Sequence, residues 1–121
     1  MLQLPASFVT ELTEFLALPN EQFARSNTIK CEYIELYARS SHRYVNDRQV
    51  ESIEIARISI EPTYQGQGLY RQILDLFETC ANGRCIYVEN VHDEAQHFIY
   101  LSRGFTLVDS IPISFYKLGG V

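Results

Sequence analysis

The sequence predicts an α+β fold in which helices flank a mixed, largely antiparallel sheet. Residues 31–38 and 50–60 alternate polar and apolar side chains, which is the pattern of strands that are buried on one face. After residue 60, helical and strand periods alternate to the end of the chain. At 121 residues and 46% hydrophobic content, we expect a single domain, 1–121, built around one core.

The residues before the first strand predict two helices. Ser7 can cap a first helix, which ends near Pro19. Its apolar face is formed by Phe8, Leu12, Phe15 and Leu16. Asn20 is predicted to start a second, short helix that runs to Arg25. Between the two strands, the polar segment from Ser40 to Gln49 is predicted to be an exposed, mobile hairpin loop.

The second half of the chain predicts two more helices and two more strands. The apolar stripe of the first of these helices consists of Tyr70, Ile73, Leu74, Phe77 and Ala81, and Asn82-Gly83 ends it. A buried strand at 86–91, a helix at 95–102 and a last strand at 113–118 follow. We expect the tail at 113–116 to offer an exposed strand edge through which two copies form a homodimer.

The segment from Ile58 to Tyr70 is the most informative part of the chain for function. An apolar strand ends at Pro62, a turn with two glycines follows, and a helix begins at once. Such a turn directs unpaired backbone N–H groups and the positive end of the helix dipole at one point, which favours an anion. Gly66 and Gly68 permit the dihedral angles and the close approach that a phosphate requires.

Two common phosphate loops do not match this turn. A Walker A loop needs Lys-Ser/Thr where Leu69-Tyr70 stands, and a dinucleotide fingerprint needs glycine where Arg71 stands. The turn resembles the pyrophosphate loop of the GCN5-related N-acetyltransferases (GNAT), Gln/Arg-x-x-Gly-x-Gly/Ala, at Gln65 and Gly68. Tyr70 departs from the small last residue of that motif, where only the backbone N–H is required.

A second motif strengthens the resemblance. Asn90 ends the strand at 86–91, and Tyr100 stands four residues before Gly104-Phe105, as a tyrosine does in the GNAT family. The two motifs together cover about residues 54–105. The resemblance implies a GNAT-like acyl-CoA N-acyltransferase fold with a shortened N-terminal half, in which a first strand and one hairpin strand are missing or shortened on the acceptor side.

The resemblance also implies an activity and a set of site residues. Acetyl-CoA would be the co-substrate, and a primary amine of a small molecule or protein would attack it directly in a ternary complex. Tyr100 would be the general acid, and Glu54 or Glu89 the general base. The acetyl-CoA site would consist of Ile58, Ile60, Gln65, Gly66, Gln67, Gly68, Leu69, Tyr70 and Asn90. The alternative is a non-catalytic module that binds CoA or a protein on the same scaffold. The loop at 40–49 would border the acceptor site.

Composition limits the partners that we expect. The net charge of −5 disfavours nucleic acid, and no apolar run is long enough for a membrane span. Three cysteines without framework spacing, and no secretory signal, favour a cytoplasmic location. His92 and His97 lie five residues apart on different helix faces, so no metal is expected.

Overall fold

The computed structural model describes residues 2–91, 93–108 and 113–119 and confirms the predicted fold class. Its elements are α1 (Ala6–Ala17), β1 (Arg25–Lys30), β2 (Ile34–Val45), β3 (Arg48–Ile60), the 3₁₀ helix η1 (Pro62–Tyr64), α2 (Leu69–Cys80), β4 (Cys85–Val88), α3 (Glu94–Ser102), β5 (Thr106–Val108) and β6 (Ser114–Lys117). The six-stranded sheet has the order β1-β2-β3-β4-β6-β5. Among the strands of the described residues, β3 and β4 pair in parallel and the other pairs are antiparallel.

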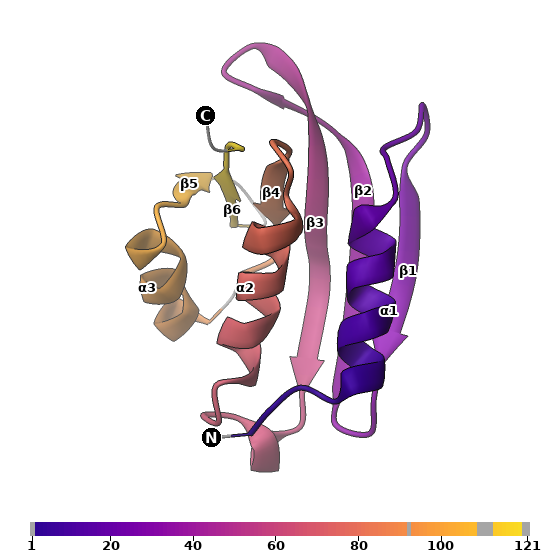
Figure 1. Cartoon of the computed structure of the whole chain (residues 1–121). Coiled ribbons are helices and arrows are strands. Elements are labelled where there is room, and N and C mark those ends of the chain that lie inside the picture. The colour runs from indigo at the N-terminus through magenta and orange to yellow at the C-terminus, as the bar shows by residue number, and fades with distance from the viewer. Residues whose placement is uncertain (1, 92, 109–112, 120–121) are drawn as a thin grey trace.

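The core lies between the sheet and the first two helices. Figure 1 shows α1 along β1 and β2, and α2 next to it along β3 and β4. Buried side chains of this layer include those of α1 (Phe8, Leu12, Leu16), α2 (Ile73, Leu74, Phe77), β2 (Ile34, Leu36, Ala38) and β3 (Ile53, Ile55). Helix α3 lies at the other end of the sheet, in contact with β5. No helix in the described part of the chain has the length and apolar content to cross a membrane.

The hairpin predicted between the two strands is confirmed, but the exposed loop predicted from Ser40 to Gln49 is too long. Strands β2 and β3 continue through this segment, and only Asn46 and Asp47 form the turn, with φ angles of 52° and 63°. Such left-handed residues are typical of two-residue hairpin turns. Arg43 in this segment forms ion pairs with Glu54 and Glu89, so a polar residue that is typical of a loop belongs here to a strand with charged partners.

The short helix predicted from Asn20 to Arg25 is also wrong. Arg25 begins β1, which pairs with β2. The side-chain amide of Asn20 donates hydrogen bonds to the carbonyls of Ser41 (2.9 Å) and Ser52 (3.0 Å), which lie on β2 and β3. Asn20 therefore holds the connection between α1 and β1 against the sheet.

The tail does not provide the strand edge on which the homodimer prediction rested. Strand β6 lies between β4 and β5 and pairs with both, so its backbone edges are used within the sheet. The edges of the sheet are β1 and β5. This part of the prediction was wrong because the pairing of a short C-terminal strand depends on contacts that are distant in the sequence.

Arg84 connects the C-terminal ends of α1 and α2. Its guanidinium donates hydrogen bonds to carbonyl oxygens in the last turns and C-caps of both helices, those of Leu16 (2.6 Å), Leu18 (3.3 Å), Cys80 (2.8 Å) and Ala81 (2.8 Å), and to Oδ1 of Asn20 (3.1 Å). The last carbonyls of a helix have no partner within the helix, so one side chain satisfies two helix ends.

We expect Arg84→Met to lower the free energy of unfolding by about 2–3 kcal/mol, because hydrogen bonds from a charged donor are lost and the helix carbonyls lose their partner. Urea denaturation measures this change. Arg48→Met, at an exposed position of the β2–β3 hairpin, is the matched control and should stay close to the wild type. Equal midpoints for both variants would show that Arg84 does not stabilise the helix ends.

Candidate active site

A cavity of about 730 Å³ opens where β3 and β4 separate. In the described residues, Ser52–Ile55 of β3 pairs with Cys85–Val88 of β4, and the strands separate after that. The last hydrogen bond between them runs from the Glu89 N–H to the Ile55 carbonyl (3.0 Å). The cavity is lined by Ile58, Ser59, Ile60, Tyr64, Gln65, Gly66, Gln67, Gly68, Leu69, Tyr70, Arg71, Asp93, Gln96 and Ile99. Among the described residues, no strand pairs with β3 on the β4 side beyond Ile55, so this edge is open to a ligand.

The turn between β3 and α2 forms one wall of the cavity and has the features of an anion site. Gly66 and Gly68 have φ angles of 74° and 84°, and Gly68 is the N-cap of α2. The backbone N–H groups from Gly66 to Arg71 have no acceptor in the part of the chain that the structure describes. Unpaired donors at a helix N-terminus favour a negatively charged ligand such as a phosphate.

The turn is fixed from the side of β3. The Gln65 side chain donates a hydrogen bond to the Ile60 carbonyl (2.8 Å), so this amide holds the turn to the last residue of the strand. Tyr64 in η1 stacks on Tyr33, with ring centroids 4.2 Å apart. The Glu61 N–H donates to the Tyr33 carbonyl (3.0 Å). These contacts hold the backbone donors in one arrangement before a ligand binds.

Tyr100 lies behind the cavity wall with an unpaired hydroxyl. Its side chain is 0% exposed, and its hydroxyl has no hydrogen-bond partner among the described residues. The ring packs edge-on against Tyr70, which lines the cavity (6.0 Å between centroids), and against Phe105 (5.3 Å), and stacks on Phe115 (5.0 Å). A buried hydroxyl without a partner costs about 1–3 kcal/mol, which an acceptor on a bound ligand would recover.

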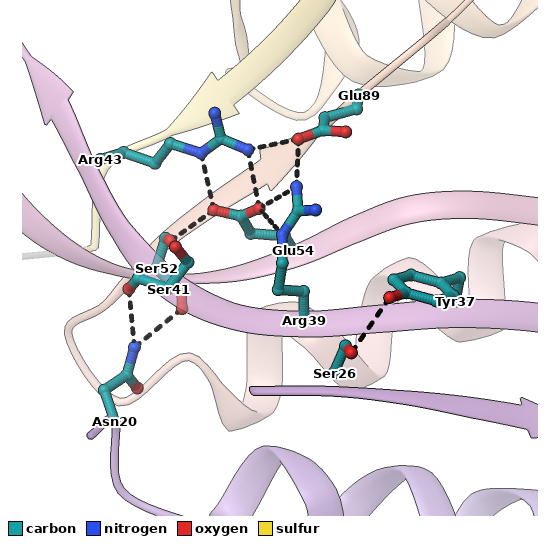
Figure 2. A network of polar contacts seen from close by, with 9 residues as sticks. All are labelled: Asn20, Ser26, Tyr37, Arg39, Ser41, Arg43, Ser52, Glu54 and Glu89. Atoms are coloured by element: carbon teal, nitrogen blue, oxygen red, sulfur yellow. Dashed lines mark hydrogen bonds and ion pairs between the residues drawn. The ribbon is translucent and has the colours of Figure 1, made fainter. Parts of the chain in front are cut away.

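Glu54 and Glu89 belong to one cluster with two arginines (Figure 2). Glu54 Oε1 accepts hydrogen bonds from Arg39 Nε (2.7 Å) and Arg43 Nη2 (2.8 Å). Its Oε2 accepts from Arg43 Nε (2.7 Å) and from the Ser52 hydroxyl (2.6 Å). Glu89 Oε1 contacts Nη2 of both arginines. The cluster is therefore a partly buried network with two positive and two negative groups, in which only Glu54 is fully buried.

The two carboxylates differ in their access to a substrate. Glu54 is 0% exposed and both of its oxygens are occupied. Burial alone would raise the pKa of Glu54, but the hydrogen bonds from Arg43, Ser52 and Arg39 outweigh it and lower the pKa below the usual value. Glu89 has a side chain that is 24% exposed, and its Oε2 has no partner in the described part of the chain. Of the two proposed bases, only Glu89 offers a free oxygen.

The lowered pKa of Glu54 predicts a specific pH dependence of stability. Its ion pairs contribute fully above the pKa of an unfolded glutamate, about 4.3, and are lost as the pH falls through the lower folded-state pKa. We expect Glu54→Gln to cost about 3 kcal/mol at neutral pH, because two arginines lose a buried partner. Urea denaturation should show this difference shrinking as the pH falls below the pKa of an unfolded glutamate. Glu35→Gln, which breaks an exposed pair with Arg57, is the control and should cost under about 1 kcal/mol. A pH-independent difference would contradict the account.

Comparison with solved structures gives the fold a name. No family model and no curated protein matches the chain. The AtaT toxin bound to the C-terminus of the antitoxin AtaR and acetyl-CoA aligns over 71% of this chain and 58% of its own, with 20% identity and a TM-score of 0.52. The ribosomal-protein-S18-alanine N-acetyltransferase from Escherichia coli aligns over 92% and 77%, with 17% identity and a TM-score of 0.52. The chain has the GNAT fold. It spans little more than half the length of the AtaT toxin.

The GNAT neighbours bear on the partners expected for this chain. KacTA was solved with DNA (82% of this chain and 70% of that one, 17% identity, TM-score 0.54), and AtaT was also solved with acetyl-methionyl-tRNAfMet. The expectation that the chain has no nucleic-acid partner, which rested on its net charge of −5, is therefore not supported.

Most of the cofactor residues that the sequence indicated line the cavity, and Asn90 does not. Asn90 follows β4 as an exposed residue with a φ angle of 58° and is not among the lining residues. Sequence reasoning missed Ser59, Tyr64, Arg71, Asp93, Gln96 and Ile99 on the wall and Arg39 and Arg43 in the cluster. The one signal that could have found Gln96 and Ile99 is their i, i+3 spacing, which puts both side chains on one face of a helix.

No metal-binding group of His, Cys, Asp and Glu occurs in the described residues, and His92 lies outside them.

Proposed function

We propose that the chain is an acetyl-CoA-dependent N-acetyltransferase that acetylates a primary amine by direct attack in a ternary complex. The observation that carries this proposal is the cavity at the separation of β3 and β4, because it combines unpaired N–H groups at a helix N-terminus with an open strand edge. The volume of about 730 Å³ is within the usual range for a small-molecule or cofactor site. An acetyl-CoA complex of a structural neighbour, AtaT, supports the choice of ligand.

The loop and the strand would share the binding of acetyl-CoA. The backbone N–H groups from Gly66 to Tyr70 would hold the pyrophosphate, and backbone groups of Ile58 and Ile60 would face the pantetheine arm. Hydrogen bonds to charged groups contribute about 1.5–3 kcal/mol each, so three or four of them supply much of the roughly 8 kcal/mol of a micromolar complex. The chain has a net charge of −5, so local backbone donors must provide this attraction.

Acetyl-CoA supplies an activated acyl group, and two side chains that lie outside the cavity lining, those of Tyr100 and Glu89, would transfer the two protons. Tyr100 would donate its phenolic proton to the sulfur as the C–S bond breaks. Glu89, through its free Oε2 and a water molecule, would accept the proton that the amine loses as the C–N bond forms. Glu54 would act through the arginines, since both of its oxygens are engaged, and would fix the position of Glu89.

The test is the release of free thiol from acetyl-CoA in the presence of a panel of primary amines, including polyamines, lysine peptides, peptides with free N-termini and aminoacyl-tRNA. Amine-dependent thiol release is the expected result. Tight binding of CoA without thiol release for any amine would favour a non-catalytic CoA-binding module instead.

A further inference from the structure

Three hydrogen bonds join residues 2–4 to the turn between β3 and α2 and to α2 itself. The Leu2 N–H donates to the Gln67 carbonyl (3.2 Å), and Gln72 Nε2 donates to the Leu2 carbonyl (2.6 Å). The Leu4 N–H donates to Gln72 Oε1 (3.0 Å). Figure 1 shows this N-terminal segment beside the turn that precedes α2. The Gln72 side-chain amide therefore pairs with the segment through both its donor and its acceptor.

One of these bonds fixes the direction of a donor in the loop. The peptide unit between Gln67 and Gly68 is planar, so its C=O and N–H point in opposite directions. The carbonyl is held by Leu2, so the Gly68 N–H points away from the N-terminal segment. Both residues line the cavity, and the Gly68 N–H belongs to the group of unpaired donors.

Gln72 also holds the next peptide unit of the turn, between Gly68 and Leu69. Its backbone N–H donates to the Gly68 carbonyl (3.2 Å), which is the first turn of α2. Leu4 is buried in the core, so the segment that Gln72 binds is anchored to the rest of the molecule. Gln72 does not line the cavity, and any effect on a ligand must pass through the loop.

We propose that Gln72 is a positioning residue: with Leu2 and Leu4, it holds the Gln67–Gly68 peptide in the orientation that binds a phosphate of acetyl-CoA. This inference rests on the proposed function of the cavity. Because coupling between two sites is reciprocal, a ligand that uses the Gly68 N–H must also stabilise the N-terminal segment.

The variant Gln72→Leu tests this inference, because leucine keeps the size and helix propensity of the residue and removes both side-chain hydrogen bonds. We expect the Kd and the KM for acetyl-CoA to rise about five- to ten-fold with kcat within about two-fold, since loss of ground-state binding raises KM alone. A purely structural role would lower the melting temperature and leave Kd and KM unchanged. Thr79→Leu, at an exposed position of the same helix, is the matched control.

Hydrogen exchange provides a readout that does not depend on activity. Acetyl-CoA should slow the exchange of the Leu2 and Leu4 amides in the wild type and have a smaller effect in Gln72→Leu. Equal Kd values for a folded Gln72→Leu and a wild type that binds acetyl-CoA would overturn the inference and leave the proposed function standing. A wild type that does not bind acetyl-CoA would overturn both.

Discussion

Tyr100→Phe is expected to lower kcat for amine-dependent thiol release by at least about ten-fold, and by up to about 10²–10⁴-fold if proton transfer to sulfur limits the reaction. The change keeps the ring, which packs against Tyr70, Phe105 and Phe115, and removes only the hydroxyl. That hydroxyl is buried and has no partner among the described residues. Its removal should therefore leave the free energy of unfolding unchanged or slightly higher, which separates a catalytic from a structural defect.

Two further variants sharpen this experiment. Tyr44→Phe removes a hydroxyl at a position that is 77% exposed and should have the wild-type kcat. Tyr70→Phe tests the neighbouring phenol, whose pKa is raised by burial and by Asp93 and which lines the cavity. Equal kcat values for Tyr100→Phe and the wild type would leave Tyr100 a packing role. A loss only in Tyr70→Phe would assign the proton to Tyr70.

Gly68→Pro is expected to weaken acetyl-CoA binding by about 10–100-fold. Proline removes the N–H and fixes φ near −65°, whereas Gly68 has a φ of 84°. The loss of one hydrogen bond to a charged group accounts for about ten-fold or more, and displacement of the neighbouring donors adds to it. Isothermal titration calorimetry with acetyl-CoA measures the effect.

The control for this variant lies at the other end of α2. Gly83 has a φ of 83°, nearly the same as Gly68, and lies outside the cavity, so Gly83→Pro introduces a similar backbone conflict. It should lower the melting temperature without changing the affinity of the folded protein. Acetyl-CoA affinity within two-fold of the wild type in a folded Gly68→Pro variant would show that the loop is not the phosphate site.

The parts of the fold that the sequence predicted well are those that local chemistry specifies. Strand β3, the glycine turn and α2 were predicted because an apolar strand, two glycines and a helical stripe follow one another without interruption. The position of Tyr100 followed from its distance to Gly104-Phe105. Each of these patterns spans few residues, and the elements that they predict do not depend on a contact that is distant in the sequence.

The parts that were missed depend on contacts that are distant in the sequence. Residues 40–45 extend β2, where Arg39 and Arg43 form ion pairs with Glu54 on β3 and with Glu89 just after β4. A polar run without such partners is typical of a loop. The same pairing occupies Glu54, which a sequence-based argument treats as a free carboxylate. The cavity wall formed by α3 depends in the same way on how that helix packs against the sheet.

The central claim is that acetyl-CoA binds where β3 and β4 separate, with its pyrophosphate on the turn before α2. Titration of the ¹⁵N-labelled chain with acetyl-CoA tests this claim most directly, because amide chemical shifts report each backbone donor. The account predicts saturable shifts that are largest for the N–H groups of residues 66–70, with smaller shifts for Ile58 and Ile60. Saturable binding with its largest shifts elsewhere, or no shift at millimolar acetyl-CoA, would contradict it.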